Sequence, residues 1–324
     1  MSTLKHRVNE FQFLDNLKSK YSLDRIGDDC AVLPKDANTD LLLTADMLVE
    51  DIDFHLKWTK PEFLGHKALA VSLSDIAAMG GQPKWAMLSL GIPEKLWNTN
   101  FVDDFYAGWF ALANEFDVEL VGGDVSRVPD KLVIDSIVGG EVAKGKAVLR
   151  SGAKPGDVIY VTGSVGGAAG GLRLLELGDE KQLSGQISTG HLTIKQTKPT
   201  PQLTIANLLQ QLDITTSMID LSDGLSSDLF HICQQSGVGA TIYTERLPIN
   251  AGLPDHFGTA ESHEMALHGG EDFELLFTVG QNNISALESI NVTCIGEITA
   301  TGGVIELNRD GKLSILEPKG YSHF

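Results

Sequence analysis

The sequence predicts an α/β protein with mixed sheets (α+β), because strand-like and helix-like segments alternate along the chain. Short apolar runs of strand length are separated by longer stretches in which apolar residues recur at helical spacing. Strands are expected at 40–46, 85–92, 117–124, 131–142, 158–163, 239–247, 273–279 and 292–299. Helices are expected at 62–79, 99–116, 167–177, 201–211 and 224–235. This alternation indicates helices packed on sheets in layers.

The chain of 324 residues is long enough for two domains without covalent cross-links. The stretch "RSGAKPGD" (150–157) is rich in Gly and Pro and precedes a new strand, so it predicts a boundary between residues 1–149 and 150–324. The segment 1–20 has the pattern of an amphipathic helix and lacks the apolar core of a secretion signal.

Composition narrows the range of partners. The chain is 42% hydrophobic and 21% charged, as in soluble globular proteins, and no apolar run approaches the ~18 residues of a membrane span. Its net charge of −18 predicts no nucleic-acid partner and no anionic membrane partner. The three cysteines, Cys30, Cys233 and Cys294, lie far apart and suggest reduced thiols, so a cytoplasmic location is expected.

The expected helix 62–79 is apolar on nearly every side, which is typical of a buried helix. Asp75 nevertheless lies within it, in the same row as Leu64, Ala68, Val71 and Ala78. A buried carboxylate costs several kcal/mol unless a cation or hydrogen-bond donors compensate it, so Asp75 calls for a specific partner.

Further aspartates stand where strands end or glycine-rich turns begin. They are Asp28, Asp29, Asp46, Asp124, Asp220 and Asp223. Capping and turn formation explain any one of them about as well as function does. Together with Asp75, however, they would repel one another, and a hard divalent cation resolves that conflict. Oxygen ligands without paired His or Cys favour Mg²⁺, and Mg²⁺ with clustered aspartates is typical of phosphoryl transfer.

The turn "VTGSVGGAAGGL" (161–172) follows a strand and opens a helix, but it fits neither common nucleotide-binding glycine motif. Close packing of strand and helix is therefore the preferred interpretation. Arg150, at the expected domain junction, is the best candidate for a cation that reaches a phosphate, with a surface ion pair as the alternative.

Eight segments in order resemble the thiamine-monophosphate kinase family of the aminoimidazole ribonucleotide synthetase superfamily. They are "IGDDCAVL", "TADMLVEDIDF", "KALAVSLSDIAAMGGQPKW", "LVGGDVSR", "RSGAKPGDVIYVTG", "IDLSDGLSSDL", "LHGGEDFELLFT" and "KGYSHF". The resemblance implies transfer of the ATP γ-phosphate to thiamine monophosphate, giving thiamine diphosphate and ADP. It also implies a homodimer in which the N-terminal domains form a shared barrel beside the C-terminal α/β domains.

The same resemblance assigns roles to individual residues. It implies Mg²⁺ ligands at Asp29, Thr44, Asp46, Asp75, Asp124, Asp220 and Asp223. It implies ATP contacts at Tyr106, Gly123, Asp124, Arg150 and Ser222. For thiamine monophosphate it implies Glu271 and Tyr321.

The chain departs from the family at "VEDIDF", where many members read "VEGVHF" with a histidine that contacts substrate. Asp53 takes that position, and His55 follows two residues later. On a strand these two positions would share a face, so either is a candidate for substrate contact.

No side chain is expected to act as a strong base, because the acceptor phosphate oxygen is already anionic and needs alignment more than deprotonation. Catalysis is instead expected to be electrostatic, with Asp46 and Asp220 central. One alternative is a sibling enzyme of the superfamily. A selenophosphate synthetase would require a reactive cysteine or selenocysteine in an N-terminal glycine-rich turn. Residues 1–27 contain no cysteine, which argues against this alternative. The other is a catalytically silent nucleotide or metal sensor, which would not need all of the clustered acids.

Overall fold

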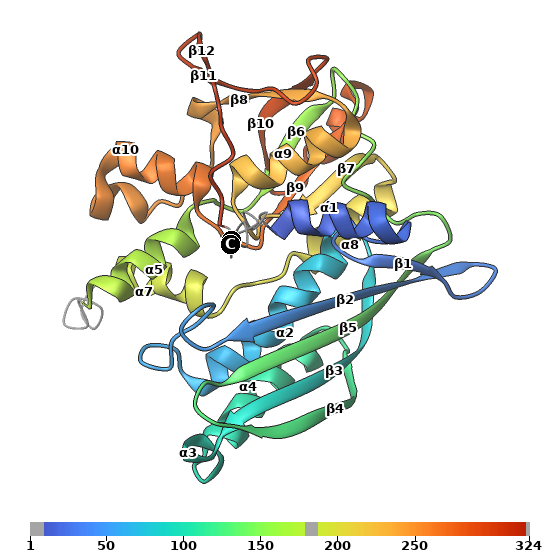
Figure 1. Cartoon of the computed structure of the whole chain (residues 1–324). Helices are drawn as coiled ribbons and strands as arrows, with labels where there is room; N and C mark the ends of the chain where they lie inside the picture. The colour runs from blue at the N-terminus through green and yellow to red at the C-terminus, as the bar shows by residue number, and fades with distance from the viewer. Residues whose placement is uncertain (1–9, 179–186, 322–324) are drawn as a thin grey trace, which may run out of the picture.

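The computed structural model describes residues 10–178 and 187–321 and contains two separate mixed β-sheets with helices around them (Figure 1). The helix expected at 1–20 corresponds to α1 (Glu10–Tyr21), while positions 1–9 lie outside the described residues. Within the described ranges, none of the helices combines the length and apolar character needed to cross a bilayer.

The first sheet has five strands in the order β1-β2-β5-β3-β4. These strands are β1 (Ala31–Pro34), β2 (Thr39–Val49), β3 (Gln82–Pro93), β4 (Glu119–Val128) and β5 (Val133–Ala143). Only β3 and β4 pair in parallel, and the helix α4 (Phe101–Glu115) connects them. A short helix, α3 (Glu94–Trp97), precedes α4. The long helix α2 (Pro61–Ala78) packs beside α4 on one face of this sheet (Figure 1).

The second sheet has seven strands in the order β12-β11-β8-β10-β6-β9-β7. They are β6 (Val158–Thr162), β7 (Thr215–Asp220), β8 (Gly239–Tyr243), β9 (Leu275–Val279), β10 (Val292–Thr299), β11 (Ile305–Arg309) and β12 (Lys312–Ile315). Its helices are α5 (Gly167–Leu177), α7 (Ile187–Thr197), α8 (Leu203–Leu212), α9 (Leu225–Ser236) and α10 (Leu253–His268), with 3₁₀ turns η1 (Thr244–Arg246) and η2 (Gln281–Leu287). All pairings are antiparallel except β11 with β8.

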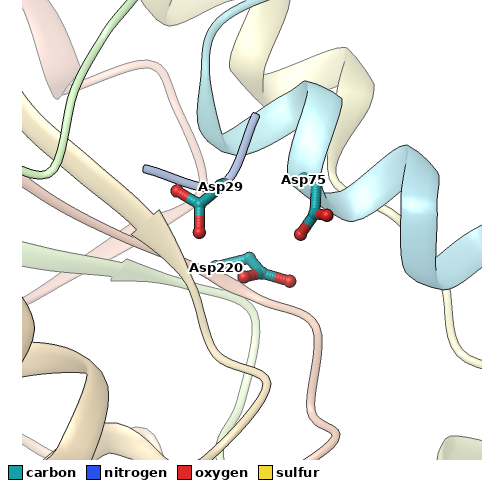
Figure 2. A group of neighbouring side chains, drawn as sticks. All are labelled: Asp29, Asp75 and Asp220. Atoms are coloured by element: carbon teal, nitrogen blue, oxygen red, sulfur yellow. The ribbon is translucent and has the colours of Figure 1, made fainter. Parts of the chain in front are cut away.

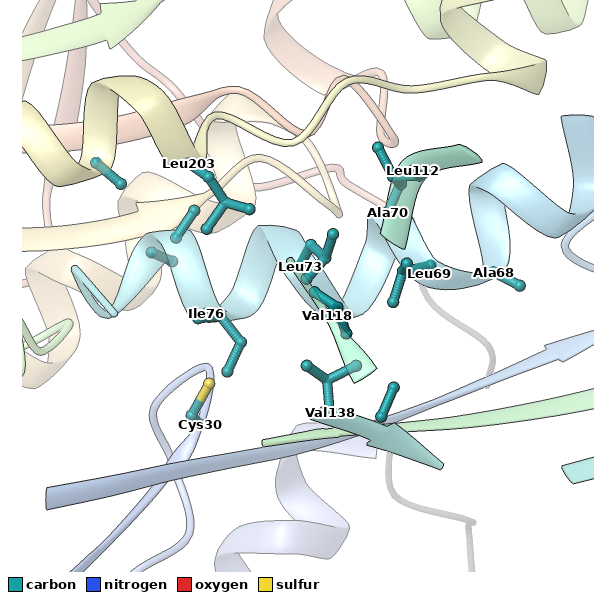
Figure 3. Packing of buried hydrophobic residues seen from close by; sticks show 14 of the residues in the cluster. Cys30, Ala68, Leu69, Ala70, Leu73, Ile76, Leu112, Val118, Val138 and Leu203 are labelled. Atoms are coloured by element: carbon teal, nitrogen blue, oxygen red, sulfur yellow. The ribbon is translucent and has the colours of Figure 1, made fainter. Parts of the chain in front are cut away.

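Helix α2 is the centre of the largest apolar core, which includes residues of both sheets. One side of α2 contacts β2 and β5, and the other contacts α8 and β7. Figure 3 shows Ile76 of α2 pointing toward Cys30 and Val138 lying on the same side of the helix, whereas Leu203 of α8 lies on the other side. The helix is therefore buried on nearly all sides, as its composition predicts, because it lies between two layers.

The fold class and every strand and helix predicted from the sequence are confirmed, with small shifts at the ends. The predicted boundary between residues 149 and 150 falls in the connection from β5 to β6. Because the main core draws residues from both sides of that boundary, the division into two domains stays a prediction.

Candidate active site

Three aspartates predicted to lie together come from three distant parts of the chain. Asp29 precedes β1, Asp75 lies on α2, and Asp220 ends β7. One carboxylate oxygen of each lies within 4.8 Å of one oxygen of the other two. Figure 2 shows the three side chains pointing toward one another, so Asp75 turns out of the apolar packing of its helix.

The electrostatics of this carboxylate cluster (Asp29, Asp75 and Asp220) are unfavourable without a cation. Burial, together with the nearby acids, raises the pKa of Asp220 from its ordinary value to about 8. Burial and the charges of Asp46 and Asp220 raise the pKa of Asp75 well above its usual range. Burial is also the largest cause that raises the pKa of Asp46, to about 6. Each shift means that the folded protein disfavours the ionised carboxylate.

Hydroxyl groups orient these carboxylates. Ser74 donates to Oδ2 of Asp220 at 2.6 Å, and Ser72 donates to Oδ2 of Asp46 at 2.6 Å. Thr44 donates to Asp75. Both serines are on α2, which therefore positions the acids of the neighbouring strands as well as its own.

Asp29 supplies a direct test of whether a cation fits. Its Oδ1 accepts hydrogen bonds from the Arg150 guanidinium, at 2.5 Å from Nη2 and 3.2 Å from Nε. Its Oδ2 is buried and has no hydrogen-bond partner among the described residues. A buried oxygen without a partner is rare and calls for an ion or water. Because that atom belongs to a cluster of hard oxygen donors, the residues present fit a divalent cation such as Mg²⁺.

Arg150 is held at both its backbone and its side chain. Its N–H donates to Oδ1 of Asp28 at 2.8 Å, while the guanidinium pairs with Asp29. Arg150 therefore lies directly beside the carboxylate cluster, as a phosphate-binding cation must, and its present partner is Asp29.

A pocket of about 720 Å³ lies beside the cluster and is lined by both halves of the chain. Its lining includes the predicted site residues Asp46, Asp53, His55, Ser222, Asp223, Glu271 and Tyr321. Asp46 lies between the pocket and the cluster: it lines the pocket, and its carboxylate accepts a hydrogen bond from Ser72, about one turn before Asp75 on α2. Pockets of a few hundred cubic ångströms that place a few polar groups among apolar walls are typical of small-molecule sites.

Asp53 and His55 both line the pocket, but not for the reason expected. Residues 51–53 form a turn in which Asp51 has φ +71°, so the expectation that 53 and 55 share a strand face is wrong. Asp53 stabilises this turn by accepting a hydrogen bond from the N–H of Val49 at 2.7 Å. His55 lies 2.8 Å from Oδ1 of Asp51 and packs edge-on against Trp58.

Glu271 is held in an uncommon backbone conformation, with φ +65°. Its carboxylate pairs with Nζ of Lys67 at 2.7 Å and accepts a hydrogen bond from Gln196. Lys67 was missed from the sequence, although it is a second charge inside the same apolar helix as Asp75. The reasoning that a charged side chain in a buried apolar helix requires a partner, which identified Asp75, would also have identified Lys67.

The C-terminal segment forms another wall of the pocket. The N–H of Tyr321 donates to the carbonyl of Asp223 at 3.1 Å, and the N–H of Gly320 donates to Ser227 at 2.9 Å. Tyr321 therefore lies beside Asp223, and both line the same pocket.

Within one chain, Gly123 and Asp124 do not join the cluster. The strand register runs from Asp46 through β5 and β3 to Gly123, a distance of three strand spacings, or about 14 Å. Asp124 is in the next row, so its side chain is on the opposite face of the sheet from Asp46. Tyr106, on α4, does not line the pocket.

The glycine-rich turn at 161–172 allows close packing, but between the helices α5 and α7 rather than between strand and helix as expected from the sequence. A Cβ on Gly171 would lie 2.2 Å from the carbonyl oxygen of Leu192. The N–H groups of Gly166 and Ala168, at the start of α5, donate to the buried carboxylate of Asp272. This helix N-terminus is therefore already capped by an anion of the protein itself.

Comparisons with known proteins identify the family of the chain. The model of the AIR synthase related protein N-terminal domain matches residues 27–142, and that of the C-terminal domain matches residues 154–307. The thiamine-monophosphate kinase of Salmonella typhimurium is 40% identical, over 92% of this chain and 91% of its own length. The chain belongs to the thiamine-monophosphate kinase family. The Bacillus subtilis family member is 38% identical, over 92% of this chain and 93% of its own length.

A solved structure extends the similarity to three dimensions. "AaThiL complexed with AMPPCP and TMP" matches with a TM-score of 0.89 and 34% identity, covering 99% of this chain and 100% of that one. The family's architecture thus applies to the whole chain.

Proposed function

We propose that this chain transfers the γ-phosphate of ATP to thiamine monophosphate, giving thiamine diphosphate and ADP. It is a phosphotransferase whose acceptor is a phosphate group, and this reaction is the last step in making thiamine diphosphate. Its relatives carry the name of this activity, and the similar AaThiL structure contains AMPPCP, an ATP analogue, together with TMP. The observation in this chain that carries the proposal is the carboxylate cluster beside a pocket of about 720 Å³.

Several Mg²⁺ ions are the proposed cofactor. Asp29, Asp75 and Asp220 would hold Mg²⁺ at the cluster, and Thr44, Asp46 and Asp223 would supply further ligands. The buried, unpartnered Oδ2 of Asp29 and the raised pKa values of the cluster support this assignment. When bound, Mg²⁺ would neutralise charge on the phosphates and polarise the phosphoryl group that is transferred.

The protein's own residues are proposed to align two anions. Oxygen of the acceptor phosphate forms a bond to the γ-phosphorus of ATP as the bond to the ADP oxygen breaks. The attacking oxygen is already anionic, so no side chain has to remove a proton from it. Arg150 and Ser222 are proposed to contact ATP, whereas Asp53 or His55, with Glu271 and Tyr321, is proposed to contact thiamine monophosphate.

A homodimer would explain the residues that lie away from the cluster. Met47 and Met87 are 61% and 39% exposed on the sheet face that is not covered by α2, and they share this face with Asp124. A second copy packed there would cover apolar surface. It would also let Asp124 and the adjacent Gly123 of the partner subunit complete the ATP and Mg²⁺ site, in a barrel shared by the two 1–149 domains. Tyr106 is on α4, on the face of the sheet that α2 covers, so its contact with ATP is proposed from the family resemblance alone.

The cytoplasm is the proposed location. Cys30, Cys233 and Cys294 are free thiols, which suits a reducing compartment in which ATP is also available. In the proposed division into two domains, residues 150–324 form the C-terminal domain, which would complete the ATP and substrate site.

Product analysis tests the activity directly. The purified enzyme is incubated with ATP and Mg²⁺ and with either thiamine monophosphate or free thiamine, and the products are separated as fluorescent thiochromes. We expect thiamine diphosphate from the monophosphate alone. Absence of product with both acceptors would overturn the proposal, and a monophosphate made from free thiamine would assign a different kinase activity.

A nearly isosteric substitution of Asp46 tests its proposed electrostatic role in catalysis. Asp46→Asn is expected to fold normally, because the amide can still accept the hydrogen bond from Ser72. We expect its turnover to fall at least a hundredfold, which corresponds to about 2.7 kcal/mol in the activation barrier. Turnover near that of the unaltered enzyme, with a native circular dichroism spectrum, would contradict the role of Asp46.

A further inference from the structure

Lys67 is a fully buried cation in the wall of the candidate substrate pocket. The residue is 1% exposed, and it lines the pocket together with Val71, one turn further along α2. An ammonium group removed from water is costly unless it is paired and hydrogen-bonded. The burial of the Lys67 ammonium group therefore has to be compensated by a charged or hydrogen-bonding partner.

Its partners come from both halves of the chain. Nζ of Lys67 lies 2.7 Å from Oε1 of Glu271 and donates to the backbone carbonyl of Asp53 at 3.2 Å. Gln196 donates to the other carboxylate oxygen of Glu271. The two oxygens of Glu271 are thus each bound by one donor, which fixes the plane of the carboxylate within the pocket.

The backbone of Glu271 is fixed as well. Its N–H donates to the carbonyl of Ser222 at 2.8 Å, and the N–H of Phe273 donates to the carbonyl of Leu221 at 2.9 Å. With φ +65°, Glu271 keeps a conformation that side chains other than Gly rarely adopt. Strain of this kind is retained where the direction of a side chain has to be defined.

Helix α2 also connects this pair with the carboxylate cluster. Lys67, Val71 and Asp75 lie on one side of the helix, and Lys67 is about 12 Å from Asp75 along the helix axis. One end of this face meets the substrate pocket, and the other meets Asp29 and Asp220.

We infer that Lys67 is a positioning residue for substrate: it pairs with the Glu271 carboxylate and aims it into the pocket, so that Glu271 can bind thiamine monophosphate. This inference rests on the proposed function and adds a residue to it. Lys67 acts through Glu271 and on the acceptor. Removing it should therefore weaken the use of thiamine monophosphate and leave the use of ATP unchanged.

Steady-state kinetics of Lys67→Met test this separation. We expect the KM for thiamine monophosphate to rise at least tenfold, while the KM for ATP stays within twofold and kcat within threefold. Lys195→Met is the matched control, because Lys195 pairs with a buried glutamate of the same segment, Glu274, at 3.3 Å but does not line the pocket. Both KM values of this control should stay within twofold. A loss confined to kcat, or an equal rise in both KM values of Lys67→Met, would overturn the inference.

The double variant Lys67→Met with Glu271→Gln separates positioning from folding. Lys67→Met alone leaves a carboxylate without its cation and can fail to fold, whereas the double variant has neither charge and should fold. If Lys67 acts through Glu271, the double variant and Glu271→Gln alone should have the same KM for thiamine monophosphate within twofold. A KM for the double variant that is at least fivefold higher than that of Glu271→Gln would show an independent role and overturn the inference.

The results that would overturn this inference differ from those that would overturn the proposed function. Absence of turnover in the unaltered enzyme would overturn both. Normal turnover of thiamine monophosphate by the unaltered enzyme, with an unchanged KM in a folded Lys67→Met variant, would overturn the inference alone.

Discussion

At the scale of single residues, Asp220 illustrates how a site can reduce the stability of the protein that carries it. Its carboxylate is 2% exposed, faces Asp29 and Asp75, and has a pKa raised from 3.8 to about 8, chiefly by burial. A group whose pKa is higher in the folded than in the unfolded state stabilises the fold only while it is protonated. The metal-free protein should therefore lose stability as the pH rises from about 4 to about 8.

The variant Asp220→Asn should gain stability and lose activity. An amide cannot ionise, and it can still accept the hydrogen bond that Ser74 donates. Without Mg²⁺ and with chelator present, we expect its Tm to exceed that of the unaltered protein by a few degrees at pH 8.5, and by less at pH 6. Turnover should fall at least a hundredfold. Thermal unfolding at the two pH values checks the first expectation, and a lower Tm for the variant at pH 8.5 would contradict it.

Single residues also show what sequence reasoning can and cannot supply about a site. Asp75 was identified because a carboxylate in an apolar helix conflicts with burial, and that conflict is visible without a structure. The place of Asp124 relative to Asp46 depends on the order and register of β2, β5, β3 and β4. Together these strands set the distance between two residues that are more than seventy positions apart in the sequence. No local pattern contains that information.

At the scale of elements, the position of α2 depends on how closely it approaches α4. A Cβ on Gly65 would lie 1.9 Å from the carbonyl oxygen of Phe105, and one on Gly108 would lie 1.8 Å from that of Glu62. Both atoms are backbone, so they cannot move aside as a flexible side chain would. The absence of a side chain at both glycines allows α2 to sit deep enough to present Lys67 and Asp75.

The variant Gly65→Ala tests this close approach. The added methyl group should push the two helices apart and lower the free energy of unfolding by about 2 kcal/mol, the usual cost of overpacking. Gly190→Ala in α7 is the control, because no atom of the described residues lies within 4 Å of its Cβ position and alanine favours helix. Urea unfolding of both variants checks the difference, and a Gly65→Ala variant as stable as Gly190→Ala would refute it.

Elements with a strong apolar pattern were predictable, and those without one were missed. Helix α2 was expected at 62–79 and is observed at Pro61–Ala78. In α10 only Leu253, Ser262, Ala266 and Leu267 are buried, and the helix is interrupted at Gly258, which has φ +72°. The strand β12 is exposed along its whole length, so no alternation of buried and exposed residues marks it. In each case the position of the element is set by its neighbours more than by its own residues.

At the scale of the whole molecule, the first sheet is covered on one face and open on the other. Leu88 and Ser136 are 2% and 1% exposed beneath α2, whereas Met87, the residue before Leu88 in β3, is 39% exposed on the opposite face. Methionine, valine and isoleucine side chains on an uncovered sheet are typical of a surface that another protein covers. In this molecule we propose that a second copy of the same chain covers this face. Asp124 is on the face and lies far from the carboxylate cluster of its own chain, although the family resemblance assigns it to the Mg²⁺ site.

Met87→Glu is therefore expected to separate the dimer and to reduce catalysis together. A carboxylate on this face would have to be buried in the interface, and the net charge of −18 on each chain adds to the cost of association. Light scattering coupled to size-exclusion chromatography should give the mass of two chains for the unaltered protein and of one chain for the variant. Turnover should fall at least tenfold at enzyme concentrations where the variant is monomeric. Ile315→Glu on β12 provides the control, because Ile315 is 65% exposed on the other sheet and should leave both mass and turnover unchanged. A fully active Met87→Glu monomer would mean that one chain contains the complete site, and Asp124 would then have no role in binding ATP or Mg²⁺.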